Sequence, residues 1–525
     1  MTELRLPINA VLGNSRCVLL SVLALGLSAC GNDTANEGRT ATVSESDITA
    51  EHSDPDLSSP ASDGSDQAER SHDAAAAAIS ATAAAVRDEA MAGTDAYELL
   101  ASLTFDVGAR LAGSDGDRRA VAWALDMLEQ RGFENVRREP VKVPRWQRGE
   151  LTVHLVDIDR VPLVATSLGG SVGTADGGVV AAVVGVSSLA ELREMDASAV
   201  AGKIVFIDQR MGRSRDGAGY GATVGNRVSA ASVAAELGAL ALVIRSVGTA
   251  EARIAHTGII IYKPGVRRIP AVALAHQDAD RLAYLLESRR EVRLRVQSTA
   301  RSLDAAESAN VIAEIPGTDA ADEIIVLAAH LDSWDLGTGA LDDGAGVAIV
   351  TKAAELLRNR EPALRRTVRV VLFANEEYGL SGSNQYRTDH ADEFAQHVLA
   401  FESDFGAGRI WQVRSLVPES TLPVIADIAA VLAPLDITQG DNQTGDGADI
   451  RVLRDAGVPI LSLDQDGTHY FDYHHTVDDT LDKVKRADLD QNVAAVAAAT
   501  YIAATTSAAL RDEAPGDAIA TDANE

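Results

Sequence analysis

The chain has 525 residues, which is more than one ordinary domain needs, so we expect two folded units with flanking tails. Hydrophobic residues make up 46% of the sequence, and 77 acidic against 47 basic side chains give a formal net charge of -30. This acidic balance argues against a nucleic-acid-binding protein, because phosphate backbones are bound by basic surfaces. A solvated, soluble surface explains most of the charge.

The N-terminus has the pattern of an export signal. Basic residues precede an apolar run over 17–27 that is short for a transmembrane helix, and small residues follow it. The end of this run, Leu-Ser-Ala-Cys30, resembles the lipobox of bacterial lipoproteins, in which the cysteine is acylated; a signal peptide cut after Ala29 is the alternative. We therefore expect a signal peptide over 1–29 and a cell-envelope lipoprotein anchored through Cys30. Gly31 favours the outer membrane over the inner one.

The cysteine content excludes two kinds of site. Cys17 would leave with the signal peptide and Cys30 would carry lipid, so the exported chain would contain neither a free thiol nor a disulfide. A cysteine nucleophile and a cysteine-ligated zinc site are both excluded. Any metal ion must then be held by histidines and carboxylates.

The next segment, over 30–75, is rich in small and polar residues and predicts a disordered tether. An alanine-rich helix over 74–86 begins the folded part. A second helix is predicted from Asp117 to Arg131, with Gly132 as its C-terminal stop. At the other end of the chain, residues 513–525 form an acidic tail that we expect to be disordered.

The middle of the chain, from 149 to 305, predicts a separate β-rich unit. Short apolar runs over 151–156, 178–184, 203–207 and 239–244 are typical of strands, and one helix is predicted over 228–237. Paired carboxylates and histidine clusters do not occur in it. The loop histidine His256 is interpreted as structural.

The remaining part alternates strands and helices. Strands are predicted over 323–329, 368–374, 397–401 and 459–463, and helices over 344–358, 421–433 and 486–509. This alternation predicts a mostly parallel sheet with helices on both faces.

Histidines and carboxylates stand where these strands end. They are His330 and Asp332 after the first strand, Asp342 and Asp343 at the start of the next helix, Glu376 and Glu377 after the second strand, and then Asp404 and His475. Ligands of open α/β sheets bind at the carboxyl ends of the strands, so these side chains should meet at one edge. Each has an ordinary explanation by itself, such as a helix cap or surface charge. Their common placement favours a shared site.

The ligand chemistry fits two zinc ions. Each ion needs about three protein ligands and one open position. One histidine and one carboxylate for each ion, with one carboxylate shared, requires five residues: His330, Asp342, Glu377, Asp404 and His475. Glu376 is then free to act as the general base on the water that the ions activate. Asp332 is placed to orient the His330 imidazole.

These segments resemble the M28 family of dizinc exopeptidases. The similar stretches are His330-Leu-Asp-Ser-Trp-Asp, Gly339-Ala-Leu-Asp-Asp-Gly-Ala-Gly, Asn375-Glu-Glu, Glu402-Ser-Asp and His475-Thr-Val-Asp-Asp-Thr. The resemblance is closest to the carboxypeptidase Q branch (plasma glutamate carboxypeptidase). It also reaches the middle unit, through Ile244-Arg-Ser-Val and His256-Thr-Gly-Ile.

The resemblance implies an α/β fold of the phosphorylase/hydrolase type. The peptidase domain, over 76–148 and 306–512, would contain a mostly parallel sheet. A protease-associated-type insert over 149–305 would interrupt this domain. It also implies two Zn2+ per chain, with His330 and Asp404 on one ion, His475 and Glu377 on the other, and Asp342 between them. The implied activity is hydrolysis of short peptides or dipeptides.

Several alternatives stay open. A single-zinc glutaminyl cyclase and a non-catalytic binding protein share the same fold, whereas a serine hydrolase lacks support because the stretch after Gly379 has no Gly-x-Ser-x-Gly elbow. Tyr473 and His474 are expected to border the substrate site, together with Tyr470 and Phe471. The sequence does not decide between aminopeptidase, carboxypeptidase and dipeptidase action, or whether a homodimer forms.

Overall fold

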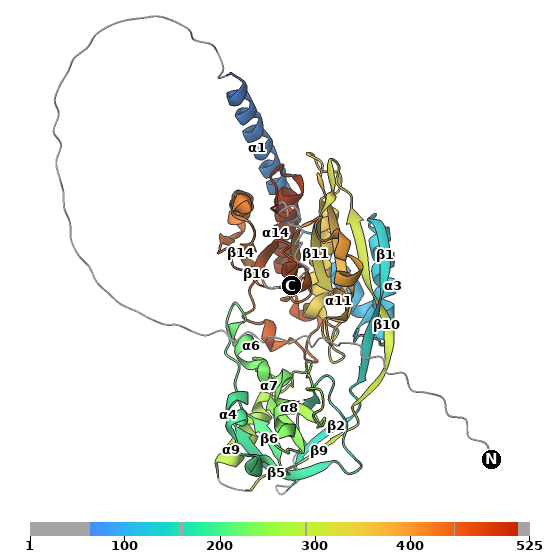
Figure 1. Cartoon of the computed structure of the whole chain (residues 1–525), viewed down its shortest axis with the longest axis vertical. Coiled ribbons are helices and arrows are strands. Elements are labelled where there is room, and N and C mark those ends of the chain that lie inside the picture. The colour runs from blue at the N-terminus through green and yellow to red at the C-terminus, as the bar shows by residue number, and fades with distance from the viewer. Residues whose placement is uncertain (1–62, 157–161, 289–290, 446, 513–525) are drawn as a thin grey trace, which may run out of the picture. The chain divides into compact units, whose positions relative to one another are not determined.

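The computed structural model describes residues 63–156, 162–288, 291–445 and 447–512 (Figure 1). The predicted signal peptide, the predicted lipidation site Cys30, most of the predicted tether and the acidic tail lie outside the described residues. The first helix, α1 (Asp63–Met91), already begins within the segment that the sequence predicts as a tether. None of the helices in these ranges is long and apolar enough to cross a bilayer.

The first sheet is mixed, with a parallel centre. Strand β11 pairs in parallel with β12 and β13, and β13 pairs in parallel with β16. Antiparallel neighbours flank this centre: β10 lies beside β12, β1 beside β10, and β14 beside β16. The sheet is therefore mixed, with parallel pairing among its central strands and between β14 and β15 at one edge, and the predicted mostly parallel sheet describes it only in part. The strands, in sheet order, are β1 (Glu134–Gln147), β10 (Arg301–Ile315), β12 (Arg366–Phe373), β11 (Ala320–His330), β13 (His397–Glu402), β16 (Ile460–Gln465), β14 (Ile410–Leu416) and β15 (Thr438–Gln439).

Helices cover both faces of this sheet because the central strands are apolar on both sides. Along β11, Ile325 and Leu327 join one hydrophobic cluster with the helices α10 and α14, whereas Ile324 and Val326 join another with α11 and α13. The helices of this half, besides α1, are α2 (Ala96–Ser102), α3 (Asp115–Gln130), α10 (Ala345–Leu356), α11 (Ser381–Asp389), α12 (Leu422–Leu432), α13 (Arg451–Asp455) and α14 (Arg486–Thr505).

The helix predicted from Asp117 to Arg131 is α3, which begins at Asp115 and ends at Gln130. Ser114 accepts a hydrogen bond from the Asp117 backbone N–H at 3.1 Å and so caps the start of α3. Gly132, with φ of +76°, ends it. The long C-terminal helix α14 is buried from Leu489 to Thr505, which explains its apolar, alanine-rich sequence.

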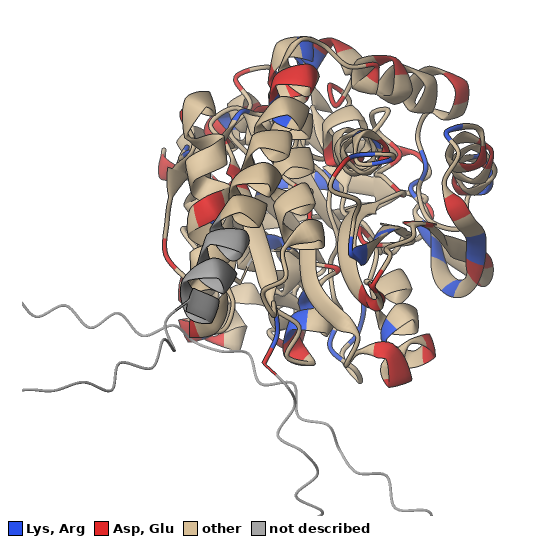
Figure 2. Cartoon of the chain, turned by 90° about the horizontal axis from the view of Figure 1, so that it is seen from above, with Lys and Arg blue, Asp and Glu red and all other residues tan. Residues whose placement is uncertain are grey.

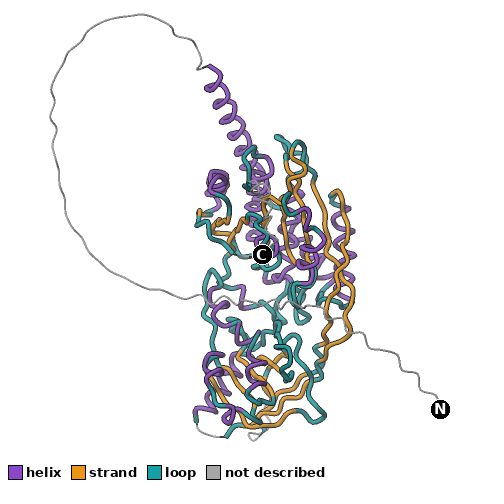
Figure 3. The backbone as a smooth tube through the Cα atoms, in the orientation of Figure 1, coloured by secondary structure: helices purple, strands orange, loops and turns teal. Residues whose placement is uncertain are grey.

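The second sheet is also mixed, and its strands come between β1 and β10 in the sequence. In Figures 1 and 3 it lies below the first sheet. Strands β5 to β8 are parallel and are flanked by antiparallel strands, and helices accompany them, so the unit is an α/β structure rather than only β-rich. Its strands, in sheet order, are β3 (Pro162–Leu163), β2 (Leu151–Leu155), β9 (Arg293–Ser298), β5 (Val179–Val186), β6 (Ile204–Ile207), β7 (Ala241–Arg245), β8 (Ala271–Leu274) and β4 (Ala165–Ser167). Its helices are α4 (Leu189–Glu194), α5 (Ala197–Val200), α6 (Ala218–Thr223), α7 (Gly225–Val228), α8 (Ala230–Glu236) and α9 (His276–Glu287).

Strands β1 and β10 form a long antiparallel ribbon that carries the chain between the two sheets. Both strands bear many charged and exposed side chains, so the hydrophobic pattern of the sequence does not reveal them. Figure 2 shows acidic and basic residues interspersed over the outer helices and loops, while the inner strands carry few charges. This distribution fits a solvated acidic surface.

Candidate metal centre

The predicted site residues meet at the carboxyl edge of the first sheet. His330 is the last residue of β11, Glu376 and Glu377 follow β12, and Asp404 follows β13. Asp342 lies in the turn that leads into α10, and the peptide bond that joins it to Asp343 is cis. The loop after β16 supplies two histidines. Residues far apart in the sequence are thus brought together by strand order.

Asp342 lies at the centre of the group, between two pairs of side chains. Its Oδ1 is 3.1 Å from His330 Nε2, and the same nitrogen is 3.4 Å from Asp404 Oδ1. Its Oδ2 is 3.2 Å from His475 Nε2, which in turn is 2.9 Å from Glu377 Oε2. Each carboxylate oxygen of Asp342 therefore lies next to a histidine that is itself paired with a second carboxylate.

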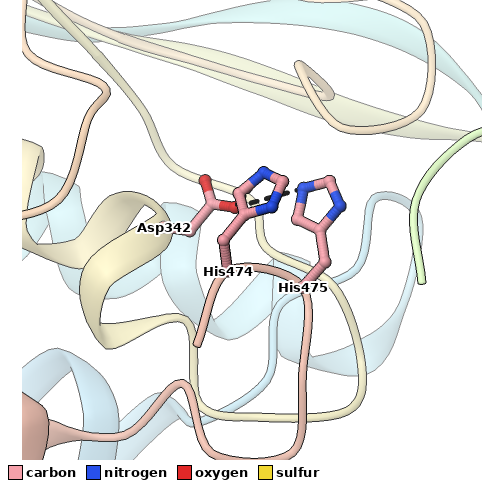
Figure 4. A group of neighbouring side chains, drawn as sticks. All are labelled: Asp342, His474 and His475. Carbon is pink, nitrogen blue, oxygen red and sulfur yellow. Dashed lines mark ion pairs between the residues drawn. The ribbon is translucent and has the colours of Figure 1, made fainter. Parts of the chain in front are cut away.

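His474 stacks on His475 and also reaches Asp342. The ring centroids are 3.5 Å apart, and His474 Nε2 is 3.6 Å from Asp342 Oδ2 (Figure 4). Asp342, His474 and His475 could hold an ion, as could His330, Asp342 and Asp404. His475 alone of the two histidines is also paired with Glu377, while the His474 ring packs against the aromatic rings of Tyr220, Tyr470 and Phe471.

The site is rich in buried negative charge. Burial raises the pKa of Glu377 well above its usual range, and the neighbouring carboxylates Asp342 and Glu376 raise it further. Burial opposes the charged form of Asp342, yet hydrogen bonds from His330 and His475 hold its pKa well below the usual range. Burial lowers the pKa of His475 to about 4, so its imidazole is neutral and can offer a lone pair to a metal.

The donor set fits a divalent cation. Glu377 Oε1 is buried and has no hydrogen-bond partner among the described residues. Leaving a buried carboxylate oxygen unpaired is costly, and a bound cation would remove this cost. Neutral imidazoles and carboxylates are the ligands that zinc takes when cysteine is absent.

Asp332 connects His330 to the turn that carries Glu376. The backbone O of Asp332 is 3.1 Å from His330 Nδ1, and its Oδ1 lies 3.6 Å from the same nitrogen. The Glu376 backbone N–H donates to Asp332 Oδ1 at 2.9 Å. Asp332 therefore positions both the imidazole and the neighbouring glutamate.

The substrate residues expected from the sequence are only partly at the site. Tyr470 packs against the His474 ring, with the ring centroids 5.0 Å apart. Burial raises the pKa of this phenol well above its usual range, and the charges of Asp342 and Asp404 raise it further. Tyr473 lies under Lys483, whose Nζ is 5.6 Å from the ring centroid. Tyr470 and Tyr473 both line a cavity of about 600 Å³. A smaller cavity, of about 220 Å³, opens beside Asp404.

The unit built on the second sheet contacts the histidine loop directly. The Thr257 N–H donates to the His475 carbonyl at 2.9 Å, and the Thr257 carbonyl is 3.4 Å from His475 Nδ1. His256 Nδ1 is 2.8 Å from the His474 carbonyl, and Arg227 Nη1 is 3.3 Å from His475 Nδ1. His256 thus has a structural role, as expected, but at the site itself. Arg227 was missed because it lies in none of the motifs, and Thr257 was missed although it belongs to the His256-Thr-Gly-Ile stretch.

The chain is similar to known peptidases in sequence and in fold. The family described as Peptidase family M28 matches residues 310–500. Carboxypeptidase Q of Bos taurus is 34% identical over 409 residues, which are 78% of this chain and 85% of that protein, and the Homo sapiens protein matches equally. The crystal structure of a Peptidase M28 precursor from Shewanella amazonensis SB2B is 43% identical with a TM-score of 0.82 and covers 84% of this chain and 100% of its own. BSAP, a zinc aminopeptidase from Bacillus subtilis, shares the fold at 19% identity with a TM-score of 0.58, over 79% of this chain and 96% of its own.

Proposed function

The chain belongs to peptidase family M28 and is a metallo-exopeptidase, and from this premise we propose that it hydrolyses short peptides, including dipeptides, with two zinc ions per chain. The proposal rests on the position of Asp342, which lies between two His–carboxylate pairs. One pair is His330 and Asp404, and the other is His475 and Glu377. A shared carboxylate between two such pairs is the arrangement that two zinc ions require.

The five ligands would hold the ions, and Glu376 would be the general base. Bound zinc would supply Lewis-acid chemistry by lowering the pKa of water and polarising the scissile carbonyl. Glu376 would take a proton from the attacking water and pass it to the leaving amine. Burial raises the pKa of Glu376 well above its usual range, which suits a carboxylate that must accept a proton. Asp332 would keep Glu376 in place through its bond to the Glu376 backbone N–H.

We also propose that the chain consists of a peptidase domain and an insert, as the sequence predicts. Residues 76–148 and 306–512 would form the peptidase domain, and residues 149–305 a protease-associated-type insert that supports the loop of His474 and His475. The cavity beside Asp404 would receive one residue of the substrate.

A panel of substrates tests this function. Purified protein is incubated with free dipeptides, N-acetylated dipeptides and longer peptides, and its zinc content is measured by elemental analysis. We expect turnover of free dipeptides and two zinc ions per chain. One zinc ion with cyclisation of N-terminal glutamine would favour a glutaminyl cyclase, and zinc binding without any turnover would favour a binding protein. Loss of turnover on N-acetylation would indicate recognition of the free amine.

We propose that lipid on Cys30 anchors the protein to the bacterial envelope and takes no part in catalysis. The Cys30→Ser variant removes the acylated thiol, so we expect it to be released in soluble form with unchanged kcat and KM. Fractionation of cells and an assay of the released protein measure both properties. Wild-type protein treated in parallel should stay in the membrane fraction. Released, folded protein without activity would contradict a purely anchoring role.

A further inference from the structure

Asp342 lies in a short turn, residues 337–342, between the end of β11 and the start of α10; we call it the Asp342 turn. The two carboxylate oxygens of Asp342 are 3.1 Å from His330 Nε2 and 3.2 Å from His475 Nε2, so a small displacement of the turn would change both distances. The backbone angles of Asp342 itself are not helical. Contacts with other parts of the chain therefore have to hold this residue in place.

Asp479, four residues after His475, holds one side of the Asp342 turn. It is 4% exposed, and its Oδ1 accepts a hydrogen bond from the Leu341 N–H at 2.6 Å, while its Oδ2 accepts one from the Asp342 N–H at 3.3 Å. Its backbone carbonyl accepts two more, from the Thr338 N–H at 2.9 Å and from the Thr338 hydroxyl at 3.2 Å. One buried residue thus joins the loop of His475 to the backbone of Asp342.

Arg110 holds the same turn through its carbonyl groups. The Arg110 side chain is fully buried, and it donates from Nη1 to the Thr338 carbonyl at 2.6 Å and from Nη2 to the Gly339 carbonyl at 3.0 Å. Its Nε donates to the Leu331 carbonyl at 2.7 Å, one residue beyond the histidine that ends β11. Arg110 therefore ties the end of β11 to the Asp342 turn.

The turn passes so closely to these two residues that glycine is required at two of its positions. A Cβ at Gly337 would lie 2.7 Å from the Asp479 carbonyl oxygen, and a Cβ at Gly339, where φ is +59°, would lie 2.9 Å from Arg110 Nη2. Such close packing leaves the backbone little freedom to move. Groups that hold a metal ligand from behind in this way strongly affect how well the metal binds.

We propose that Asp479 and Arg110 are positioning residues that fix the Asp342 carboxylate between the two metal sites, and that they set the affinity of both sites together. The inference rests on the two-zinc site of the proposed function. Each residue would act through Asp342 rather than on an ion or on the substrate. Removing either one would let the shared carboxylate move relative to both histidines at once, so both ions should bind more weakly.

The Asp479→Asn variant tests the proposal, because it keeps the size of the side chain but replaces one accepting oxygen by an amide nitrogen that cannot accept. We expect both zinc dissociation constants to rise by about 10–100-fold in calorimetry on the metal-free protein. Excess zinc should restore most of kcat for a free dipeptide, with wild-type KM, since all five ligands are still present. The visible absorption of the Co2+-loaded protein should shift, because it reports the geometry of the ligands.

The matched control is Asp478→Asn, which makes the same chemical change one residue away. Asp478 is only partly buried, and within the described part of the chain its carboxylate accepts no hydrogen bond from the Asp342 turn. We expect wild-type zinc affinity, Co2+ absorption and kcat for this variant. Circular dichroism of both metal-free variants establishes that they are folded at the temperature of the measurement.

Arg110→Lys tests the second support, and it carries the test by itself if Asp479→Asn does not fold. Lysine keeps the positive charge but has a single nitrogen, so it cannot reach all three carbonyl groups that the guanidinium holds. Both zinc dissociation constants should rise again. Arg119→Lys is its control, because Arg119 donates at 2.8 Å to the Val107 carbonyl rather than to the Asp342 turn, and it should bind zinc as the wild-type protein does.

A double-mutant cycle separates this role from a general loss of stability. In the Asp342→Asn background, Asp479→Asn should weaken the remaining zinc binding no further, since both changes act through one carboxylate. Three results would overturn the inference: wild-type zinc affinity in folded Asp479→Asn, a loss confined to one of the two ions, and a full additional loss in the double mutant. The proposed function is judged separately, by turnover of free dipeptides in the wild-type protein.

Discussion

Replacing Glu376 by glutamine is expected to lower kcat for a free dipeptide by about 10²–10⁴-fold, the usual contribution of a general base. The amide has nearly the same size and shape as the carboxylate but cannot accept the proton of the attacking water. Neither His–carboxylate pair around Asp342 includes Glu376, so zinc content and thermal stability should stay at the wild-type level. Steady-state kinetics and elemental analysis of the same preparation measure both quantities.

Glu377→Gln is the matched control for this experiment, since it makes the same chemical change one residue away. Glu377 Oε2 is 2.9 Å from His475 Nε2, and its Oε1 is buried without a partner, so this variant should lose zinc as well as activity. Should Glu376→Gln lose zinc while Glu377→Gln retains it, the roles assigned to the two glutamates would have to be exchanged.

Replacing Asp342 by asparagine is expected to have the second large effect, because this carboxylate faces both pairs. A neutral amide removes charge from both ion positions at once, so the zinc content should fall below about one ion per chain and hydrolysis should be lost. Zinc at about 100 times its Kd should stabilise the wild-type protein by about 2.7 kcal/mol, and most of this gain should disappear in the variant. Thermal unfolding with and without added zinc measures the difference.

Asp343→Asn provides the comparison for this variant. The Asp343 carboxylate accepts hydrogen bonds from the backbone N–H groups of Gly346, at 2.9 Å, and of His330, at 3.2 Å, and so caps the start of α10. We expect lower stability in this variant with zinc still bound. Retention of two zinc ions in Asp342→Asn would show that the ions do not share this carboxylate.

Much of the site could be predicted because its residues follow local patterns. The runs predicted over 323–329 and 397–401 lie within β11 and β13, and β12 includes the run over 368–374 except for Ala374. Almost all residues of these runs are buried. The carboxyl ends of neighbouring parallel strands lie at the same edge of a sheet. Side chains just beyond these strands are therefore close together for any conformation of the loops. The sequence contains only two cysteines, which we assign to the signal peptide and to lipidation. Histidines and carboxylates are therefore the metal ligands that remain.

Other features depend on contacts between distant parts of the chain. The ribbon of β1 and β10 is held by pairing over a separation of more than a hundred residues, and its charged strands show no clear period. Tyr473 stands next to His474 in the sequence, yet its ring lies under Lys483, because the direction of a loop side chain is set by what packs around it.

The sequence by itself therefore determined the class of the central sheet, the edge on which the site lies and the kinds of ligand available, because all three depend on residues within single strands and their ends. Only the tertiary structure decided that Asp342 lies between two His–carboxylate pairs, and that Arg227, His256 and Thr257 reach the histidine loop from the second sheet. The contacts from the second sheet join residues more than two hundred positions apart, and no local pattern in the sequence encodes them.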